Sequence, residues 1–469
     1  MYLLVIYITL TKKERKNKMN KVYLVRHSIS VGNEEGIIQG NIDYSLSKSG
    51  IELLNKFDYT MIKDIRKIYS SPCKRTLETS KIIKRKLNAN CDIIIDNDII
   101  EKQAGILNGK SKDYLKKYKK KYLDIYLKRG DYDKIPDGET WELTQARVLS
   151  FLEKYIDKQD ECDLVVTHAA FMRMFINTIN FEYRNKSKDL PNACLYVIDN
   201  PLKKIIVEKY EIAKTSTVYK ITTYDNSYIL KRINRNLTKY DYSINKLLIN
   251  LSKYITVPKP IYMSNKNGYS IKIYKYIEGK HILGNMNEDY IKNLVKSVYK
   301  LTNLLTEYSE RNIYDSFEKK DIISDMFSMK KELKNKKYIK IVDNLINDDE
   351  LNKYLDSAKY VLVHNDLHRY NIVFERKKIG FLDFDGLKLC PELLQLASFV
   401  STCFLLEDNS IKIENILKYW PEKVNINIVK KLILYRLLYG LSFFDKKSNY
   451  SKTDEKIIKK YINAIERMI

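Results

Sequence analysis

The sequence predicts two fused domains, an α/β domain with a mostly parallel sheet followed by an α+β domain. The chain has 469 residues, which is more than one hydrophobic core normally holds and favours two or three domains. In the first part, short apolar runs alternate with helical patterns, as is typical of parallel β/α units. From about residue 210 a hairpin signal begins a second pattern that becomes mostly helical.

Three apolar runs of the first part are predicted to be buried strands that each lead into a polar loop. They cover residues 22–25, 67–69 and 164–166. Helices are expected over residues 47–57 and 74–87. Active residues of parallel sheets gather at the carboxyl ends of the strands. Arg26, His27, Arg75 and His168 all fall there or just beyond.

A lysine-rich stretch carries tyrosines at a spacing of four. They are Tyr114, Tyr118, Tyr122 and Tyr126. This spacing predicts one helix with an aromatic packing face and a solvated basic face.

In the second part, strand patterns at 217–223 and 228–233 flank Asp225-Asn226, a hairpin signal. Further strand-like runs lie at 269–276, 360–363 and 379–382, and the chain is predicted to be helical from 392 onward. The apolar run 432–444 carries Arg436 and is predicted to be a buried core helix. No linker composition separates the two parts. We therefore expect domains at 20–210 and 211–469, joined within 200–213.

Residues 1–10 are apolar but too short to span a membrane, which takes about 20 residues. Positive charges follow this run, whereas a signal peptide carries them before it. We expect residues 1–19 to be an extension outside the fold.

The composition has limited meaning for function. The net charge of +25 could suggest nucleic-acid binding. The enriched Lys, Ile, Asn and Tyr share AT-rich codons, however, so we do not expect a nucleic-acid partner. The six cysteines show no CxxC pair, which indicates free thiols in a reducing compartment and a cytoplasmic location.

The first group of polar residues has the composition of a phosphate site. Two arginines, Arg26 and Arg75, can hold phosphate oxygens with their planar forks. A neutral imidazole of His27 or His168 can attack phosphorus. A carboxylic acid such as Glu101 can protonate the leaving oxygen.

These residues lie in motifs that resemble the histidine phosphatase family, which includes cofactor-dependent phosphoglycerate mutases. The motifs are R-H-S-I-S-V-G-N at 26–33, L-S-K-S-G at 46–50, S-S-P-C-K-R-T at 70–76, E-K-Q-A-G at 101–105, D-G-E-T at 137–140 and V-T-H-A at 166–169. The resemblance implies a three-layer phosphoglycerate mutase-like fold without a cofactor. The family usually has Gly where this chain has Ser28, which is expected to narrow the loop beside the nucleophile.

The resemblance also implies the roles of the first site. His27 is the expected nucleophile and Glu101 the general acid. The expected phosphate-binding residues are Arg26, Arg75 and His168, assisted by Asn33.

The second group lies in V-H-N-D-L-H-R-Y-N-I-V at 363–373 and G-F-L-D-F-D-G at 380–386. Asp366 and Asn371 share one short loop, and Asp383 closes a strand. Oxygen ligands of this kind suit Mg²⁺ bound with nucleotide phosphates. An additional Asp can orient or deprotonate an attacking hydroxyl.

This segment resembles the aminoglycoside phosphotransferase and choline kinase family, which has the two-lobed protein-kinase-like fold. The resemblance implies that Asp366 is the catalytic base and that Asn371 and Asp383 bind Mg²⁺. Lys231 is then expected to hold the phosphates of ATP or GTP, and Tyr274 and Tyr276 to lie at the nucleobase hinge.

Two features depart from that family. The helix after Lys231 lacks a Glu to pair with the lysine, for which Asp241 or Asn245 could substitute. The first hairpin contains no glycine. We expect a bifunctional enzyme that hydrolyses a small phosphate ester and phosphorylates a small-molecule hydroxyl. The alternative is a phosphatase or phosphoglycerate-type mutase with a degenerate, nucleotide-binding regulatory domain.

Overall fold

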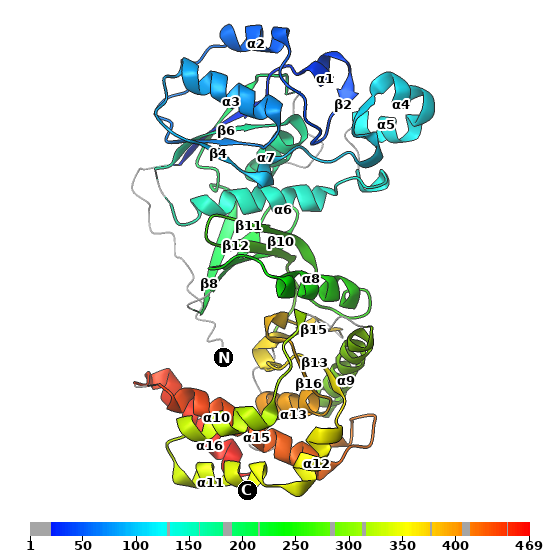
Figure 1. Cartoon of the computed structure of the whole chain (residues 1–469), viewed down its shortest axis with the longest axis vertical. Coiled ribbons are helices and arrows are strands. Elements are labelled where there is room, and N and C mark those ends of the chain that lie inside the picture. Colours follow the sequence, from blue (N-terminus) through cyan, green and yellow to red (C-terminus); the bar gives the residue numbers. More distant parts are fainter. Residues whose placement is uncertain are drawn as a thin grey trace. The chain divides into compact units, whose positions relative to one another are not determined.

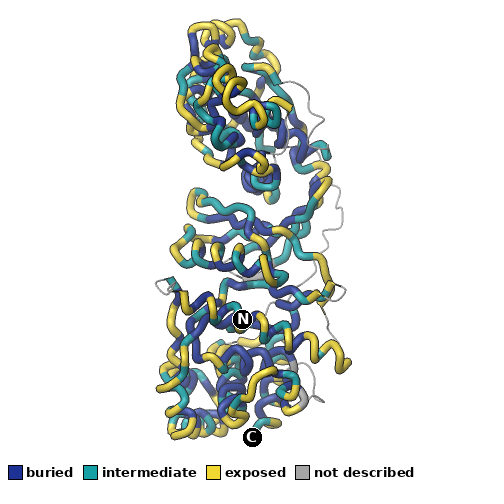
Figure 2. The backbone as a smooth tube through the Cα atoms, turned by 90° about the vertical axis from the view of Figure 1, so that its right-hand side faces the viewer, coloured by how far each residue is buried: buried dark blue, intermediate teal, exposed yellow. Residues whose placement is uncertain are grey.

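The computed structural model describes residues 20–128, 132–158, 160–181, 190–213, 216–281, 287–311, 316–375, 378–405, 413–447 and 449–469. The extension expected at 1–19 lies outside them. The chain divides into two compact units. One contains the described residues up to Asn236 together with Ile261–Tyr276, and the other contains Leu237–Pro260 and Ile277–Ile469. Each unit has its own buried interior, coloured dark blue in Figure 2.

The first unit contains a five-stranded sheet in the order β4-β3-β6-β1-β7. Its strands are β1 (Lys21–Arg26), β3 (Lys67–Ser70), β4 (Ile93–Ile95), β6 (Cys162–Thr167) and β7 (Leu195–Asp199). The paired strands are parallel except that β7 runs antiparallel to β1. This confirms the predicted, mostly parallel sheet.

Helices cover both faces of this sheet (Figure 1). The helices of this domain are α1 (Val31–Glu34), α2 (Lys48–Asn55), α3 (Lys74–Lys86), α4 (Lys112–Tyr118), α5 (Lys120–Leu127), α6 (Trp141–Leu152) and α7 (Ala169–Asn180). Strand β2 (Ile37–Ile38) pairs antiparallel with β5 (Lys110–Ser111). Side chains of β1 alternate between faces. Tyr23 and Val25 share a core with α2 and α3, and Val22 and Leu24 share one with α6 and α7. The domain is therefore the predicted three-layer α/β fold.

The same unit contains a second five-stranded sheet in the order β11-β12-β10-β9-β8. Its strands are β8 (Ile206–Ala213), β9 (Ser216–Thr222), β10 (Ser227–Ile233), β11 (Pro260–Asn265) and β12 (Ser270–Lys275). Tyr219, Ile221, Tyr228 and Leu230 lie in one buried cluster with Phe151 and other core residues of the first domain. Figure 1 shows α6 between the two sheets.

The other unit is mainly helical. Its helices are α8 (Lys239–Leu251), α9 (Glu288–Glu310), α10 (Ile322–Glu332), α11 (Lys336–Ile346), α12 (Asp349–Ser357), α13 (Leu394–Val400), α14 (Ile413–Leu417), α15 (Ile426–Asp445) and α16 (Lys452–Glu466). This unit also contains two antiparallel pairs of strands. Strand β13 (Tyr360–Val363) pairs with β16 (Lys388–Pro391), and β14 (Ile372–Glu375) pairs with β15 (Lys378–Phe381). With the second sheet, these elements give the α+β architecture that the sequence predicts.

Helix α15 contains the predicted core run, and most of its apolar side chains are buried. In the part of the chain that the structure describes, no helix has both the length and the apolar character needed to cross a membrane.

The prediction of a single helix through the tyrosine run is wrong. The backbone leaves helical geometry at Lys119, where φ is −139° and ψ is 33°, and this residue separates α4 from α5. Each helix buries one leucine, Leu115 or Leu123. Tyr114 and Tyr118 are exposed and contact each other at 4.9 Å between ring centroids. Tyr122 and Tyr126 pack against the cluster that contains both leucines, so only this half of the tyrosine run forms the predicted packing face.

Candidate active sites

A pair of histidines meets at the carboxyl ends of β1 and β6. Arg26 is paired with Thr167 in the parallel register, and the His27 N–H donates to the Thr167 carbonyl at 2.9 Å. His168 follows directly, so the two imidazole rings meet edge to face with 5.2 Å between centroids. Both side chains are buried. The register of two strands thus builds the centre of this site.

The tautomer of His27 follows from one hydrogen bond. Its Nδ1 lies 2.7 Å from the Ser28 carbonyl oxygen, which can only accept. Nδ1 therefore carries the proton, and Nε2 has the free lone pair. Burial, together with the charges of Arg75 and Arg26, holds the pKa of His27 well below its ordinary value of 6.5. The ring is neutral near pH 7 and can act as a nucleophile.

His168 has the opposite tautomer. Arg75 Nη2 donates to His168 Nδ1 at 3.2 Å, so Nε2 carries the proton and donates to Ser71 Oγ at 2.8 Å. Burial, followed by the charge of Arg75, also lowers the pKa of His168 well below 6.5. The guanidinium thus fixes the orientation of the second imidazole.

The two arginines keep donors for an anion. Arg75 donates to the Gly40 and Ile42 carbonyls at 2.5 and 2.8 Å, and Arg26 donates to the Leu190 carbonyl at 2.5 Å. The Nε of each is buried and has no hydrogen-bond partner among the residues that the structure describes. Buried donors without partners are costly. A bound phosphate could accept from both, so these residues fit a phosphate ester.

Glu101 lies at the start of α7. One carboxylate oxygen accepts from the Ala170 and Phe171 N–H groups at 3.1 Å each and from the Lys102 N–H at 2.9 Å. The free N–H groups of a helix start attract a carboxylate. Since α7 begins directly after His168, this contact holds Glu101 beside the histidine pair.

Asn33 is already engaged in local structure. Its Oδ1 caps α1 by accepting from the Ser30 N–H at 3.1 Å and also accepts from Asn192 Nδ2 at 3.2 Å. Its own Nδ2 is therefore the group that could hold a phosphate oxygen. Ser28 Oγ donates to the Gly50 carbonyl at 2.7 Å, which directs the hydroxyl toward α2.

Sequence reasoning missed two residues of this site. Asn192 Nδ2 lies within 3.1 to 3.2 Å of the carbonyls of His27 and Ser28 and thereby fixes the loop that carries His27. Ser71 fixes His168. The Ser-Ser-Pro motif contained Ser71, but no pattern marked Asn192.

The second site is built on the loop after β13. Asn371 Nδ2 donates to the Asp366 carbonyl at 2.8 Å and lies 3.3 Å from His368 Nε2. With its amide nitrogen held there, Asn371 Oδ1 is the atom that could bind a cation. The Leu382 N–H donates to the Asn371 carbonyl at 2.8 Å. Asp383, the next residue, therefore lies close to Asn371. Asp383 has a left-handed φ of 58°, which costs free energy in a non-glycine residue.

The carboxylate of Asp366 remains partly exposed, at 29%, and lies 3.8 Å from His368 Nε2. It can therefore be reached by a hydroxyl group. Burial lowers the pKa of both His364 and His368 below 6.5. Since His364 Nε2 lies 2.8 Å from the Leu382 carbonyl, it connects the Asp366 loop with the Asp383 segment.

Two supports of this loop were not predicted. Arg436 of α15 donates to the side-chain and backbone oxygens of Asn365 at 3.0 and 2.8 Å. Gln395 Oε1 accepts from the His364 N–H at 2.8 Å. The core helix containing Arg436 was foreseen, but its role in holding the loop was not.

Lys231, Tyr274 and Tyr276 belong to the second sheet, in the first unit. Lys231 lies opposite Val218 and Lys272, Tyr274 lies opposite Ile229, and the Tyr276 N–H donates to the Ser227 carbonyl at 3.0 Å. Their combination with Asp366, Asn371 and Asp383 stays a prediction.

Asp241, a possible partner for Lys231, forms hydrogen bonds at the start of its own helix, α8. Its Oδ2 accepts from the N–H and hydroxyl of Thr238 at 2.7 and 2.9 Å in a capping box at the start of α8. Tyr240 donates to the carbonyls of Asp385 and Leu387 at 2.8 and 2.9 Å. Helix α8 is thereby attached to the segment after Asp383.

The arrangement of the two sites agrees with comparisons to known proteins. Residues 22–212 match the histidine phosphatase superfamily (branch 1), and residues 211–407 match the phosphotransferase enzyme family. Over 165 residues the chain is 33% identical to "Probable phosphoglycerate mutase GpmB" of Escherichia coli O1:K1, covering 34% of this chain and 75% of that protein. The first part of the chain therefore belongs to the histidine phosphatase superfamily, and the second part contains a phosphotransferase-like domain.

Two solved structures are similar to portions of this chain. Amicoumacin kinase hAmiN in complex with AMP-PNP, Ca²⁺ and Ami has 16% identity and a TM-score of 0.45, covering 56% of this chain and 88% of that chain. Phosphoglycerate mutase from Bacillus anthracis str. Sterne has 20% identity and a TM-score of 0.32, covering 42% of this chain and 92% of that chain.

Proposed function

We propose that this chain is a bifunctional enzyme with a phosphatase and a kinase activity. The phosphatase removes phosphate from a small ester through a phosphohistidine, and the kinase transfers the γ-phosphate of ATP or GTP to a small-molecule hydroxyl. The main support is the buried, neutral His27 beside His168, with two arginine Nε donors that lack partners among the described residues. The six free cysteines support a cytoplasmic location.

In the phosphatase reaction, His27 Nε2 attacks phosphorus, so a P–N bond forms while the bond to the ester oxygen breaks. Glu101 gives its proton to that leaving oxygen. Arg26, Arg75 and His168 hold the other phosphate oxygens, where negative charge accumulates in the transition state. Glu101 then takes a proton from water, whose oxygen attacks phosphorus as the P–N bond breaks, which releases phosphate and returns neutral His27 and protonated Glu101.

In the kinase reaction, Asp366 takes the proton of the acceptor hydroxyl, whose oxygen attacks the γ-phosphorus of the nucleotide. Asn371 Oδ1 and the Asp383 carboxylate would hold Mg²⁺, which neutralises phosphate charge when bound. Lys231 contacts the nucleotide phosphates, and Tyr274 and Tyr276 border the nucleobase.

One observation favours a second candidate for the kinase-like part. Asp241 is used in a helix cap, and α8 contains no glutamate. A degenerate kinase-like domain could bind nucleotide and regulate the phosphatase without transferring phosphate. Nucleotide binding without any transfer would favour this candidate.

The test uses the variant His27→Ala, in which phosphatase action cannot remove a product. This variant is incubated with ATP or GTP, Mg²⁺ and a metabolite extract, and mass spectrometry detects new phosphoesters. One new phosphoester would identify the acceptor, and wild-type protein would then show whether the phosphatase reverses the reaction. No product with either nucleotide would contradict the kinase activity.

The same variant tests the phosphatase. We expect His27→Ala to lose hydrolysis of phosphate esters and to keep kinase activity, because His27 is the nucleophile only of the first reaction. His281→Ala is the matched control, since His281 lies outside both groups of motifs and is exposed. Full hydrolysis by His27→Ala would refute the assignment of the nucleophile.

A further inference from the structure

The chain segment that carries Glu101 is held from the second sheet. Asp98, in the short 3₁₀ helix η1 (Asn97–Ile99), is 1% exposed. Its carboxylate accepts from the Tyr262 hydroxyl at 2.8 Å and from Lys266 Nζ at 2.5 Å. Tyr262 lies in β11 and Lys266 follows it. Both donors therefore come from the region that matches the phosphotransferase family.

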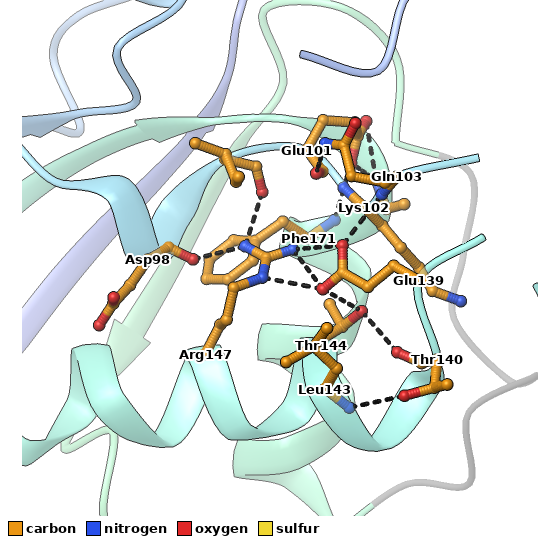
Figure 3. A network of polar contacts seen from close by, with 12 residues as sticks. Asp98, Glu101, Lys102, Gln103, Glu139, Thr140, Leu143, Thr144, Arg147 and Phe171 are labelled. Atoms are coloured by element: carbon orange, nitrogen blue, oxygen red, sulfur yellow. Dashed lines mark hydrogen bonds and ion pairs between the residues drawn. The ribbon is translucent and has the colours of Figure 1, made fainter. Parts of the chain in front are cut away.

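The same segment is held from α6 by a buried ion pair. Arg147 Nη1 donates to the carbonyls of Asp98 and Ile100 at 2.6 and 2.9 Å, and its Nε and Nη2 bind Glu139 at 2.8 and 3.0 Å. Glu139 Oε2 also accepts from the Gln103 N–H at 2.9 Å. Figure 3 shows Arg147 between Asp98 and Glu139, with Glu101 and Gln103 next to the latter.

These contacts hold residues on both sides of Glu101. Asp98 and Ile100 precede it and Gln103 follows it, so the backbone at Glu101 has little freedom to shift. Lys266 also pairs with Asp96 at 3.2 Å. Burial would lower the pKa of Lys266, but Asp98 and Asp96 outweigh burial and raise it. Lys266 is therefore charged, and its loss would remove the ion pair of the buried Asp98 carboxylate, which is costly.

We propose that Tyr262 and Lys266 are positioning residues for the general acid Glu101, so that the phosphatase depends on side chains of the kinase-like sheet. This inference rests on the proposed phosphatase function. Tyr262 and Lys266 fix Asp98, Asp98 fixes the segment 98–103, and that segment fixes the distance from the Glu101 carboxyl to the leaving oxygen. A small displacement of a proton donor lowers the rate strongly.

The variants Tyr262→Phe and Lys266→Met test this inference when their rates are compared on two phosphate esters with different leaving groups. An alkyl phosphate releases a basic alkoxide and needs protonation, whereas p-nitrophenyl phosphate releases a stable phenolate and needs little. We expect kcat on an alkyl phosphate to fall on the order of 10-fold to 100-fold. We expect kcat on p-nitrophenyl phosphate to change little. A loss of folded protein would lower both rates by the same factor.

Tyr269→Phe is the matched control. Tyr269 also donates from the second sheet to the first domain, but its partner is Glu153 Oε2 at 3.1 Å rather than Asp98. This variant should leave the ratio of the two rates at its wild-type value. An unchanged ratio in Tyr262→Phe and Lys266→Met, with His27→Ala inactive, would overturn the positioning role while the phosphatase function stands.

Amide hydrogen exchange gives a readout that needs no substrate. The Lys102 and Gln103 N–H groups bind the Glu101 and Glu139 carboxylates, so loosening of the segment should raise their exchange rates in Tyr262→Phe and Lys266→Met, but not in Tyr269→Phe. Equal exchange in all variants and wild type would refute the inference even if no phosphate ester were hydrolysed.

Discussion

In the proposed phosphatase reaction, neutral imidazole is the reactive state of His27, and its neighbours keep it in that state. Burial and the charges of Arg75 and Arg26 disfavour the protonated ring. The Ser28 carbonyl binds the proton on Nδ1, so Nε2 keeps its lone pair. No deprotonation has to precede the attack on phosphorus. In that proposal, the same arginines that lower the pKa of His27 would attract the substrate phosphate.

These low pKa values predict how the free energy of unfolding depends on pH. The pKa of His27 and that of His168 are well below 6.5 in the folded chain and return to about 6.5 on unfolding. As the pH falls below 6.5, the unfolded chain therefore binds protons that the folded chain does not. Each such histidine should lower the free energy of unfolding by about 1.4 kcal/mol per pH unit.

Urea denaturation of the first unit between pH 7.5 and 5.5 measures this slope. The double variant with His27→Gln and His168→Gln should lose less free energy of unfolding over this range than wild type. Equal slopes for the double variant and wild type would show that these histidines protonate normally when folded.

Asp366→Asn tests the proposed catalytic base of the second site. The amide keeps the shape of the side chain but cannot take a proton from the acceptor. We expect the phosphoryl-transfer rate to fall by about 10²–10⁴, with nucleotide affinity nearly unchanged, as measured by calorimetry with ATP and Mg²⁺. Asp385→Asn is a control in the neighbouring segment. A wild-type transfer rate for Asp366→Asn would exclude the role of Asp366.

The positions of some site residues could be predicted because their motifs end strands. Arg26, His27 and His168 follow apolar runs, and the parallel register brings the two histidines together. Asn192 and Arg436 could not be predicted in this way. Each is a single polar residue distant in sequence from the loop that it supports, so only the tertiary structure reveals the contact.

At the scale of elements, the strands were easier to predict than the packing of their faces. Strands β9 and β10 agree with the predicted hairpin around Asp225-Asn226. Alternation shows that Tyr219 and Ile221 share a face, but it does not show what covers that face. The structure places these side chains in one core with α6 of the first domain.

Leu230→Ala tests this shared core. Leu230 lies in β10, is fully buried and precedes Lys231. Its truncation should cost about 2–5 kcal/mol of free energy of unfolding. Because the core is shared, the temperature at which the phosphatase is inactivated should fall, although Leu230 lies outside the phosphatase match.

Leu438→Ala is the matched control for this experiment. Leu438 is equally buried, but it lies in α15 of the other unit. It should lower the inactivation temperature of the kinase and leave that of the phosphatase near the wild-type value. A phosphatase that is insensitive to Leu230→Ala would refute the shared core.

For the whole molecule, the two family matches and the two compact units divide the chain differently. The matches meet at 211–212, within β8, whereas the compact units separate the second sheet from most of the kinase-like part. The absence of a linker composition in 200–213 predicted a close join. It could not reveal that the second sheet completes the core of the first domain, because that depends on side chains from distant strands.

Truncation of the chain tests this division directly. A chain that ends at Ile205 contains the first sheet and its helices but lacks β8 to β12. It exposes the apolar side chains that α6 buries against Tyr219, Tyr228 and Ile273. Each such side chain contributes about 1.5–3 kcal/mol when buried, so the loss approaches the whole stability of a domain, about 5–15 kcal/mol. We expect this chain to aggregate and to lack phosphatase activity.

A chain that ends at Tyr276 keeps the second sheet and is the matched comparison. It should unfold cooperatively on heating and should hydrolyse phosphate esters, because it contains the complete shared core, the two histidines and the contacts of Tyr262 and Lys266 with Asp98. Calorimetry measures the unfolding, and a phosphatase assay measures the hydrolysis of phosphate esters. If the chain ending at Ile205 unfolded cooperatively and hydrolysed esters at the full-length rate, the first domain would be independent of the second sheet, and the phosphatase would end where its family match ends.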